Sequence, residues 1–208
     1  MMSVTDFYAL IGIDLVACAV LLRATSVLVP ALATPKAPAW VMWLSAIFLI
    51  VLWLPFGDAG LPLLAFARGI LSDLSVTSVL LALLYLAQHL GFSLDHDYDH
   101  EKRVVHIALT CAALVLYPTA LGWGDWDAYR LGWGGATLVM GLSLLTLFCF
   151  SAGLRLLPML VAGALMAWSF GLLESGNLWD YLMDPWITCV SIGAVLKAGW
   201  GVFRRPVL

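Results

Sequence analysis

Charged residues are scarce in this chain: Asp, Glu, Lys and Arg make up 11% of its 208 residues, while hydrophobic residues make up 63%. Ordinary soluble domains carry about 25% charged residues, so a soluble globular domain is not expected. The ten Lys and Arg residues are scattered. Nucleic acid is set aside as a partner, because proteins that bind it gather basic residues on one surface. We expect the lipid bilayer to be the solvent of this protein.

Cysteine motifs and a basic leader are lacking as well. The four cysteines each fall inside an apolar run and never in a C-x-x-C spacing, so neither a zinc site nor a redox dithiol is indicated, and no cofactor is predicted. Near the N-terminus, Asp6 stands where a signal peptide would carry Lys or Arg. We expect the first apolar run to remain in the protein as a membrane helix.

Long apolar runs are what the chain has in abundance. A helix needs about 20 apolar residues to cross about 30 Å of hydrocarbon, and seven runs reach or approach that length: 7–29, 39–56, 76–92, 104–121, 136–152, 156–173 and 186–203. The connectors are short and rich in Pro, Gly and Asp, which leaves no room for a soluble domain. The sequence therefore predicts an all-α, polytopic membrane bundle, with residues 1–208 in a single membrane domain. Because several runs are short, six crossings with one re-entrant segment is an alternative.

One connector, LPLLAFARGILSDLS at 61–75, is too apolar for a free loop and too charged to lie in lipid. Its apolar residues recur at near-helical spacing and are interrupted by Arg68 and Asp73, which predicts a helix lying in the membrane interface. An extension of the third membrane helix is the alternative.

Basic residues indicate the orientation, because Lys and Arg near the ends of membrane helices stay in the cytoplasm. With seven crossings, Arg68 and Arg130 fall on one side. The other eight fall on the opposite side: Arg23, Lys36, Lys102, Arg103, Arg155, Lys197, Arg204 and Arg205. This predicts an N-terminus outside and a C-terminus in the cytoplasm, in a bacterial inner membrane.

Acidic and aromatic residues gather on the predicted outer face, above all in GWGDWDAYRLGWGG (122–135) and ESGNLWDYLMDPW (174–186). The polar residues of this candidate site are Arg68, Asp73, Asp125, Asp127, Arg130, Glu174, Asn177, Asp180 and Asp184. Its aromatic rim comprises Trp123, Trp126, Tyr129, Trp133, Trp179, Tyr181 and Trp186. An aromatic belt with solvated carboxylates is typical of membrane proteins. Arginines among carboxylates favour instead a site for a lipid headgroup, a sugar or a partner's periplasmic domain.

Asp14 belongs to the same candidate site, although it lies inside the first apolar run. It is seven residues, or about 10 Å, from the predicted outer end of that helix. An intramembrane acid faces a partner or a wet cavity, and we expect Arg68 or Arg130 to form a salt bridge with it. A proton or ion pathway is the alternative.

Four histidines raise two further hypotheses on the predicted inner face. His96 and His100 lie four residues apart in SLDHDYDHEKR, as two ligands of one metal ion would on a helical turn. A solvated charged loop explains the same residues. His89 and His106 lie at equal depth in successive helices, as a bis-histidine haem requires and as two interfacial histidines also would. Neither a metal nor a haem is predicted.

The piece ARGILSDLS at 67–75, before an apolar helix, resembles the RG…DL stretch in the membrane regions of two groups of enzymes. These are the lipoteichoic-acid-synthase-like and phosphoethanolamine-transferase enzymes of the alkaline phosphatase superfamily. The Asp-Pro of YLMDPW extends the likeness. Their catalytic domain, with its metal-bound nucleophile, has no counterpart in these residues, so no catalytic residue carries over. The resemblance implies an envelope-related setting.

These features predict an accessory or scaffold protein, not an enzyme, that engages a membrane or periplasmic partner or lipid headgroups through its acidic and aromatic outer face. The alternative is a small membrane enzyme or transporter acting on a lipid-linked or polar substrate. In an enzyme, Asp125 or Asp127 would form an acid and base pair with Glu174, Asp180 or Asp184. No nucleophile of fixed spacing accompanies them.

Overall fold

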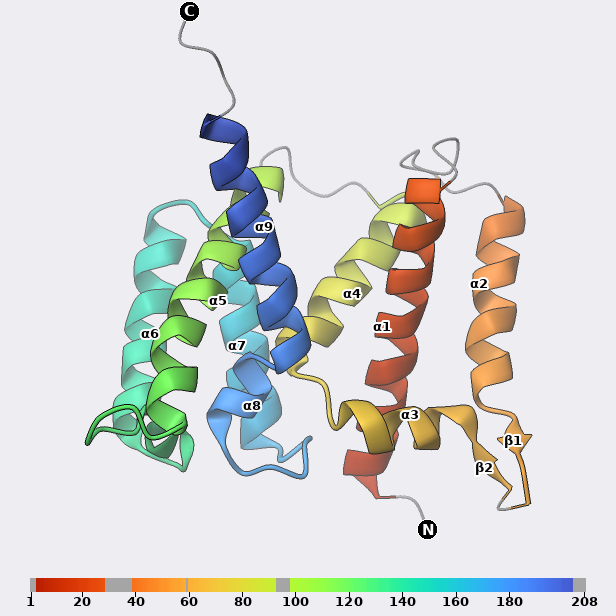
Figure 1. The fold of residues 1–208 in the computed structure, drawn as a ribbon, viewed down its shortest axis with the longest axis horizontal. Coiled ribbons are helices and arrows are strands. Elements are labelled where there is room, and N and C mark those ends of the chain that lie inside the picture. The colour runs from red at the N-terminus through yellow and green to blue at the C-terminus, as the bar shows by residue number, and fades with distance from the viewer. Residues whose placement is uncertain (1–2, 29–38, 59, 93–97, 204–208) are drawn as a thin grey trace, which may run out of the picture. The chain divides into compact units, whose positions relative to one another are not determined.

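The structure of the protein, a computed structural model, describes residues 3–28, 39–58, 60–92 and 98–203. In these residues the chain is helical, with nine α-helices, a 3₁₀ helix and one two-stranded hairpin, which confirms the predicted all-α class. The chain divides into two compact units, Met1–Leu94 with Gly171–Glu174, and Asp95–Phe170 with Ser175–Leu208. Figure 1 labels the α-helices and strands of both.

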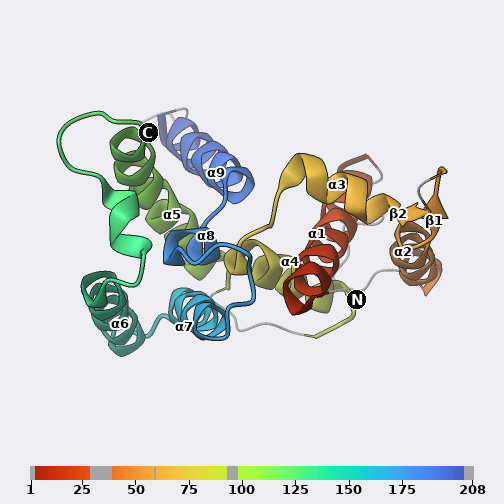
Figure 2. The ribbon, with the colours of Figure 1, turned by 90° about the horizontal axis from the view of Figure 1, so that it is seen from below.

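The first unit contains four helices and the hairpin: α1 (Val4–Leu28), α2 (Ala39–Leu52), β1 (Pro55–Phe56), β2 (Leu61–Pro62), α3 (Leu63–Leu71) and α4 (Val76–His89). Helix α1 contacts α2, α3 and α4 (Figures 1 and 2). Its Leu10 and Ile13 pack with Leu64 of α3 and Val79 of α4 in a buried cluster. Glycine at position 12 permits this approach, because a Cβ there would lie 2.9 Å from Val79 Cγ2.

The second unit comprises α5 (Tyr98–Ala120), η2 (Ala128–Gly132), α6 (Ala136–Ser151), α7 (Leu156–Ser169), α8 (Leu178–Leu182) and α9 (Pro185–Phe203). Helix α5 packs along α9 and also contacts α7 and η2, while α7 contacts α6 and α8. The pairing of α5 with α9 is visible in both Figures 1 and 2.

Every predicted apolar run corresponds to a helix, with ends that shift by a few residues. The predicted interfacial segment 61–75 contains β2 and α3. The hairpin, η2 and α8 were not predicted, because each is too short to produce a periodic pattern. Helix α5 begins at Tyr98 rather than at residue 104. Asp99 and Glu101 lie in its first turn, where negative charge stabilises the helix N-terminus.

Two stretches of the described residues, Val4–Val27 and Tyr98–Ala120, are long and apolar enough to cross a membrane. Shorter apolar helices accompany them: Trp43–Leu52, Val76–His89, Ala136–Ser151 and Leu156–Ser169. A core helix of a soluble protein passes the same test when it is mostly buried. Here only 39% and 22% of the two apolar windows are buried within the structure, which supports a membrane protein.

Glu101 connects α5 to the start of α7. Helix α7 has no side-chain cap of its own. Instead, the Glu101 carboxylate accepts hydrogen bonds from the backbone N–H groups of Arg155, at 2.8 Å, and Leu156. Glu101 is only 8% exposed, so these two donors satisfy a buried charge at the end of the helix where negative charge is favoured.

We predict that Glu101→Ala lowers the free energy of unfolding by about 1–3 kcal/mol, because two N–H donors at the start of α7, of which that of Leu156 is buried, lose their acceptor. Glu101→Gln retains one acceptor oxygen and should cost less. Asp99→Ala is the matched control, since Asp99 is exposed in the same helical turn. Thermal unfolding in detergent measures all three, and equal melting temperatures for Glu101→Ala and Asp99→Ala would contradict this capping role.

Candidate functional site

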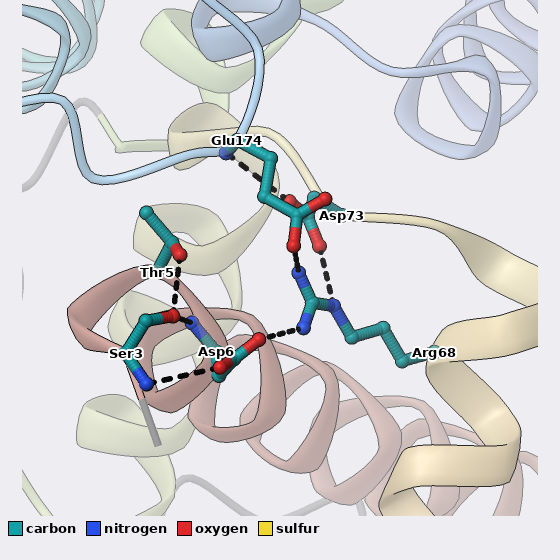
Figure 3. A network of polar contacts seen from close by, with 6 residues as sticks. All are labelled: Ser3, Thr5, Asp6, Arg68, Asp73 and Glu174. Atoms are coloured by element: carbon teal, nitrogen blue, oxygen red, sulfur yellow. Dashed lines mark hydrogen bonds and ion pairs between the residues drawn. The ribbon is translucent and has the colours of Figure 1, made fainter. Parts of the chain in front are cut away.

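Arg68 binds three carboxylates in the first unit, an arrangement called here the Arg68 cluster (Figure 3). Its Nη1 lies 2.5 Å from Asp6 Oδ1, its Nε 2.8 Å from Asp73 Oδ1 and its Nη2 2.6 Å from Glu174 Oε1. The planar guanidinium can donate to several oxygens at once, which the point charge of lysine cannot do with the same geometry. The cluster therefore joins α1, the turn after α3 and the segment Gly171–Glu174.

Local backbone geometry places two of these acids. Ser3 and Asp6 form a capping box at the start of α1: Ser3 Oγ accepts the Asp6 N–H and Asp6 Oδ2 accepts the Ser3 N–H, both at 3.0 Å. The other Asp6 oxygen remains for Arg68. After α3, the backbone of Ser72 adopts φ 62°, a conformation that residues other than glycine rarely take. This turn precedes Asp73, which folds back onto Arg68.

The charge of the cluster is unbalanced, since three carboxylates surround one guanidinium. The hydrogen bond to Asp73 is the largest influence on Arg68 and, with those to Asp6 and Glu174, it raises the pKa of the guanidinium above its already high value. Arg68 is therefore charged at every pH at which the protein folds. Glu174 is the most open member, with a side chain 65% exposed against 16% for Asp73.

A second set of polar residues, the Tyr129 network, lies in the second unit. The Tyr129 hydroxyl donates to Asp180 Oδ2 at 2.9 Å, and the Ser175 hydroxyl donates to the same oxygen. Asn177 Nδ2 donates to the Tyr129 carbonyl at 2.9 Å, while Asn177 Oδ1 caps α8 by accepting the Trp179 N–H. Burial and the Asp180 carboxylate raise the pKa of Tyr129 to about 12, so its hydroxyl remains a donor.

Close contact between η2 and the loop before α8 requires glycine at position 132. A Cβ there would lie 1.7 Å from Asn177 Oδ1. Asn177 is fully buried, and Trp179 Nε1 adds a hydrogen bond of 3.0 Å to the Ala128 carbonyl. The two predicted loops are thus joined by hydrogen bonds within this unit.

The remaining predicted polar residues take separate positions. Asp127 caps η2 and Asp184 caps α9, where Asp184 Oδ1 accepts the N–H groups of Trp186 and Ile187 at 2.9 Å. Asp125 and Arg130 are exposed, and within the described residues Arg130 forms no ion pair. The structure therefore makes Arg68, not Arg130, the arginine that organises carboxylates.

The predicted aromatic rim divides by exposure. Trp123, Trp126, Trp133 and Trp186 are 76%, 55%, 61% and 51% exposed. Tyr181 is fully buried, which removes it from any rim, and Tyr129 and Trp179 are partly buried in the network. Trp133 packs edge-on against Tyr129, with ring centroids 6.2 Å apart. We call the exposed Trp123, Trp126 and Trp133 the tryptophan rim.

The predicted salt bridge between Asp14 and Arg68 is wrong, because the Arg68 donors bind the carboxylates of Asp6, Asp73 and Glu174 instead. Asp14 is 7% exposed, and its Oδ2 accepts the Trp53 indole N–H at 3.0 Å. Within the described residues, its Oδ1 is buried without a hydrogen-bond partner. The indole is a neutral donor, so it leaves a carboxylate here without a counter-charge.

The described residues contain no arrangement that supports the metal or the haem hypothesis for the histidines. His96 lies outside the described residues, and no group of three metal-ligating side chains occurs within them. His89 belongs to the first unit and its Nδ1 lies 3.0 Å from the Tyr85 carbonyl. His106 belongs to the second unit and its Nδ1 lies 3.0 Å from Ser191 Oγ.

Sequence reasoning missed Asp6, Ser175 and Glu101 as members of these networks. The signal for Asp6 was the S-x-x-D spacing from Ser3, which is typical of a helix start. Glu101 and Ser175 gave no such signal, because their partners are set by tertiary packing. No protein-family model, curated protein or solved structure matches the chain.

We predict that Arg68→Gln lowers the free energy of unfolding by about 2–3 kcal/mol, since three charge-assisted hydrogen bonds are lost and the acids are left close together. Arg68→Lys should recover part of this loss. Glu174→Gln should cost under about 1 kcal/mol because Glu174 is the most exposed partner. Arg130→Gln is the control and should change stability by less than about 0.5 kcal/mol. Denaturant or thermal unfolding measures the stability of each variant. A larger loss of stability for Arg130→Gln than for Arg68→Gln would contradict the prediction.

Proposed function

We propose that this protein is a multi-pass protein of a bacterial inner membrane with seven crossings, an outer N-terminus and a cytoplasmic C-terminus. The seven crossings would be α1, α2, α4, α5, α6, α7 and α9, with α3 in the outer interface. The exposed apolar surface supports this: on α6 alone, Leu144, Leu147, Phe148 and Phe150 are between 65% and 72% exposed. Such a surface is costly in water and favourable in lipid.

In that topology the protein acts as an accessory or scaffold protein whose outer face engages a partner or lipid headgroups. The tryptophan rim is the observation that carries this proposal. Trp123, Trp126 and Trp133 are exposed beside η2. Trp133 contacts the ring of Tyr129, whose network is held together by internal hydrogen bonds. Large aromatic side chains on a rigid base are what recognition surfaces use, because little side-chain entropy is lost on binding.

The rim can be tested by placing a photoreactive amino acid at position 123, 126 or 133 in cells. Positions 144 and 147, on the apolar surface of α6, serve as controls. From the rim positions we expect a discrete adduct with one protein or one class of lipid headgroup, whereas the control positions should give only mixed adducts with bulk lipid. The triple variant Trp123→Ala/Trp126→Ala/Trp133→Ala should reduce the recovery of that partner at least about tenfold, by the loss of aromatic contacts worth more than about 1.4 kcal/mol together. Equal cross-linking from rim and control positions would contradict the proposal.

A second candidate function, transport or catalysis on a polar substrate within the membrane, is favoured by Asp14. Its unpartnered Oδ1 and its burial are unusual, because buried polar atoms nearly always have a hydrogen-bond partner. Acids inside membrane helices are typical of proton and ion sites. A protonated Asp14 would still accept from Trp53 and would carry no buried charge.

If Asp14 is a protonatable membrane acid, the hydrophobic reagent dicyclohexylcarbodiimide should modify it, because this reagent attacks protonated carboxyl groups in lipid. We expect an adduct on the peptide containing Asp14, its yield falling as the pH of the medium rises. Asp14→Asn should abolish this adduct while keeping the Trp53 hydrogen bond and the fold. Mass spectrometry of the digested protein measures it. Absence of labelling at Asp14 in the folded protein would exclude this candidate function.

A further inference from the structure

The Asp180 carboxylate in α8 is held by neutral groups and keeps one oxygen free. Its Oδ2 accepts hydrogen bonds from the hydroxyls of Tyr129, at 2.9 Å, and of Ser175. In the part of the chain that the structure describes, its Oδ1 accepts no hydrogen bond and is not enclosed, in contrast to the unpartnered Oδ1 of Asp14. Asp180 forms no ion pair there either. Its negative charge is therefore fixed in place, uncompensated and open to a ligand at Oδ1.

Two aromatic rings border this carboxylate. Tyr129 carries the hydroxyl that binds Asp180, and the Trp133 ring stands nearly perpendicular to the Tyr129 ring, at 86° with centroids 6.2 Å apart. Trp133 also lies against Gly176, the residue after Ser175, because a Cβ at position 176 would be 3.7 Å from Trp133 Cζ3. The Trp133 side chain still remains 61% exposed. We call Asp180, Tyr129 and Trp133 the Asp180 site, and all three belong to the second unit.

Hydrogen bonds hold the surroundings of the Asp180 site in place. Trp168 Nε1 donates to the Gly176 carbonyl at 2.9 Å, and the Asn177 N–H donates to Ser175 Oγ at 3.1 Å. The segment that supports both the Trp133 ring and the Asp180 carboxylate is thus anchored within its own unit. A ligand meets the ring and the carboxylate already in position, so little conformational entropy is lost on binding.

A positively charged organic group is the ligand that the Asp180 site fits. The carboxylate attracts a cation, and the negative face of an aromatic ring attracts one as well. A divalent metal ion binds best to several oxygen ligands, whereas no group of three metal-ligating side chains occurs in the described residues. A neutral sugar would leave the Asp180 charge uncompensated. An alkylammonium group satisfies both the carboxylate and the rings.

Arg130 adds a positive charge beside the same tryptophan. η2 is a 3₁₀ helix, in which side chains three residues apart lie one above the other. The Trp133 N–H donates to the Arg130 carbonyl at 3.3 Å, so the two side chains share one side of η2. Arg130 is exposed and, within the described residues, forms no ion pair. A free guanidinium binds phosphate oxygens through forked hydrogen bonds. A ligand with both a phosphate and an ammonium therefore matches the two charges.

We propose that the Asp180 site and Arg130 bind the headgroup of a zwitterionic phospholipid, with its ammonium at Asp180 Oδ1 and the aromatic rings and its phosphate at Arg130. This inference rests on the proposed function, in which the outer face engages lipid headgroups, and it specifies the headgroup. η2 follows α5, which is long enough to cross a membrane, and tryptophans gather at headgroup depth. A lysine of a protein partner would match the carboxylate but would bring no group for Arg130.

Lipid binding to the purified full-length protein in detergent, measured by native mass spectrometry, tests this proposal. The probes are phosphatidylethanolamine, phosphatidylcholine and phosphatidylglycerol with identical acyl chains, of which only the first two carry an ammonium. We expect the unchanged protein to bind these two at least about tenfold tighter than phosphatidylglycerol, because only they place a cation on the carboxylate and the rings.

Variants separate the two charges of the headgroup. Asp180→Asn should reduce the binding of both ammonium lipids to the level of phosphatidylglycerol, because the amide still accepts from Tyr129 but carries no charge. Arg130→Gln should weaken the binding of all three lipids, since each contains the phosphate. Asp58→Asn, an equal loss of charge from an exposed loop of the first unit, is the matched control and should change neither affinity nor preference. Thermal unfolding shows whether each variant is folded.

Two results would overturn the proposal: equal affinity of the unchanged protein for the three lipids, or an undiminished preference for the ammonium lipids in a folded Asp180→Asn variant. Photo-cross-linking from position 133 separates this failure from that of the proposed function. A discrete protein adduct that is lost in Asp180→Asn would make the cation a lysine of that partner, so the recognition surface would stand and the lipid assignment would fail. Labelling no more specific than that from positions 144 and 147 would instead remove the proposed function itself.

Discussion

The Arg68 guanidinium is the interaction on which the first unit depends, because it bonds to acids that are distant in sequence. Asp6 is 62 residues and Glu174 is 106 residues away, while Asp73 is local. Apolar contacts between α1, α3 and α4 alone would permit several helix positions, since hydrophobic burial is non-directional. Three directed hydrogen bonds to one rigid plane select a single arrangement. The strained φ of Ser72 is a cost that this arrangement requires.

Several buried polar residues in the described part of the chain cap a helix end, some of them from a distant position in the sequence. Glu101 caps α7 from another helix, Asn177 caps α8 while also holding η2, and Asp184 caps α9. Against this background the unpartnered oxygens of Asp14 and Thr110 stand out. Native structures leave few such atoms, and those that persist are enriched where chemistry or transport takes place. This contrast distinguishes α1 and α5 from the other described helices.

The helices were predictable from sequence because each apolar run is a local signal whose length and bounding Pro, Gly and Asp residues determine it. The start of α5 lies earlier than predicted, because the polar segment 98–103 also fits a solvated loop, although acids in a first turn favour a helix. The candidate site was predictable only as a composition. Arg68, Asp73 and Glu174 were recognised as neighbours on one face, and the structure brings them together. The partners of Asp14 and Tyr129 were not predictable, since the position of a residue along the chain does not determine which neighbouring element its side chain faces.

Helix length connects these observations. Helices α2, α4 and α7 have 14 residues each, which is about 21 Å and shorter than an average hydrocarbon core of about 30 Å. If these helices cross the membrane as proposed, residues at both of their ends lie near the headgroups, so hydrogen-bonding groups there need caps or partners of their own. Caps such as Ser75 on α4 and Glu101 on α7 meet this need at short helices. The longer α5 has no such constraint in its middle, and polar residues there, His106 and Thr110, require another reason to be retained.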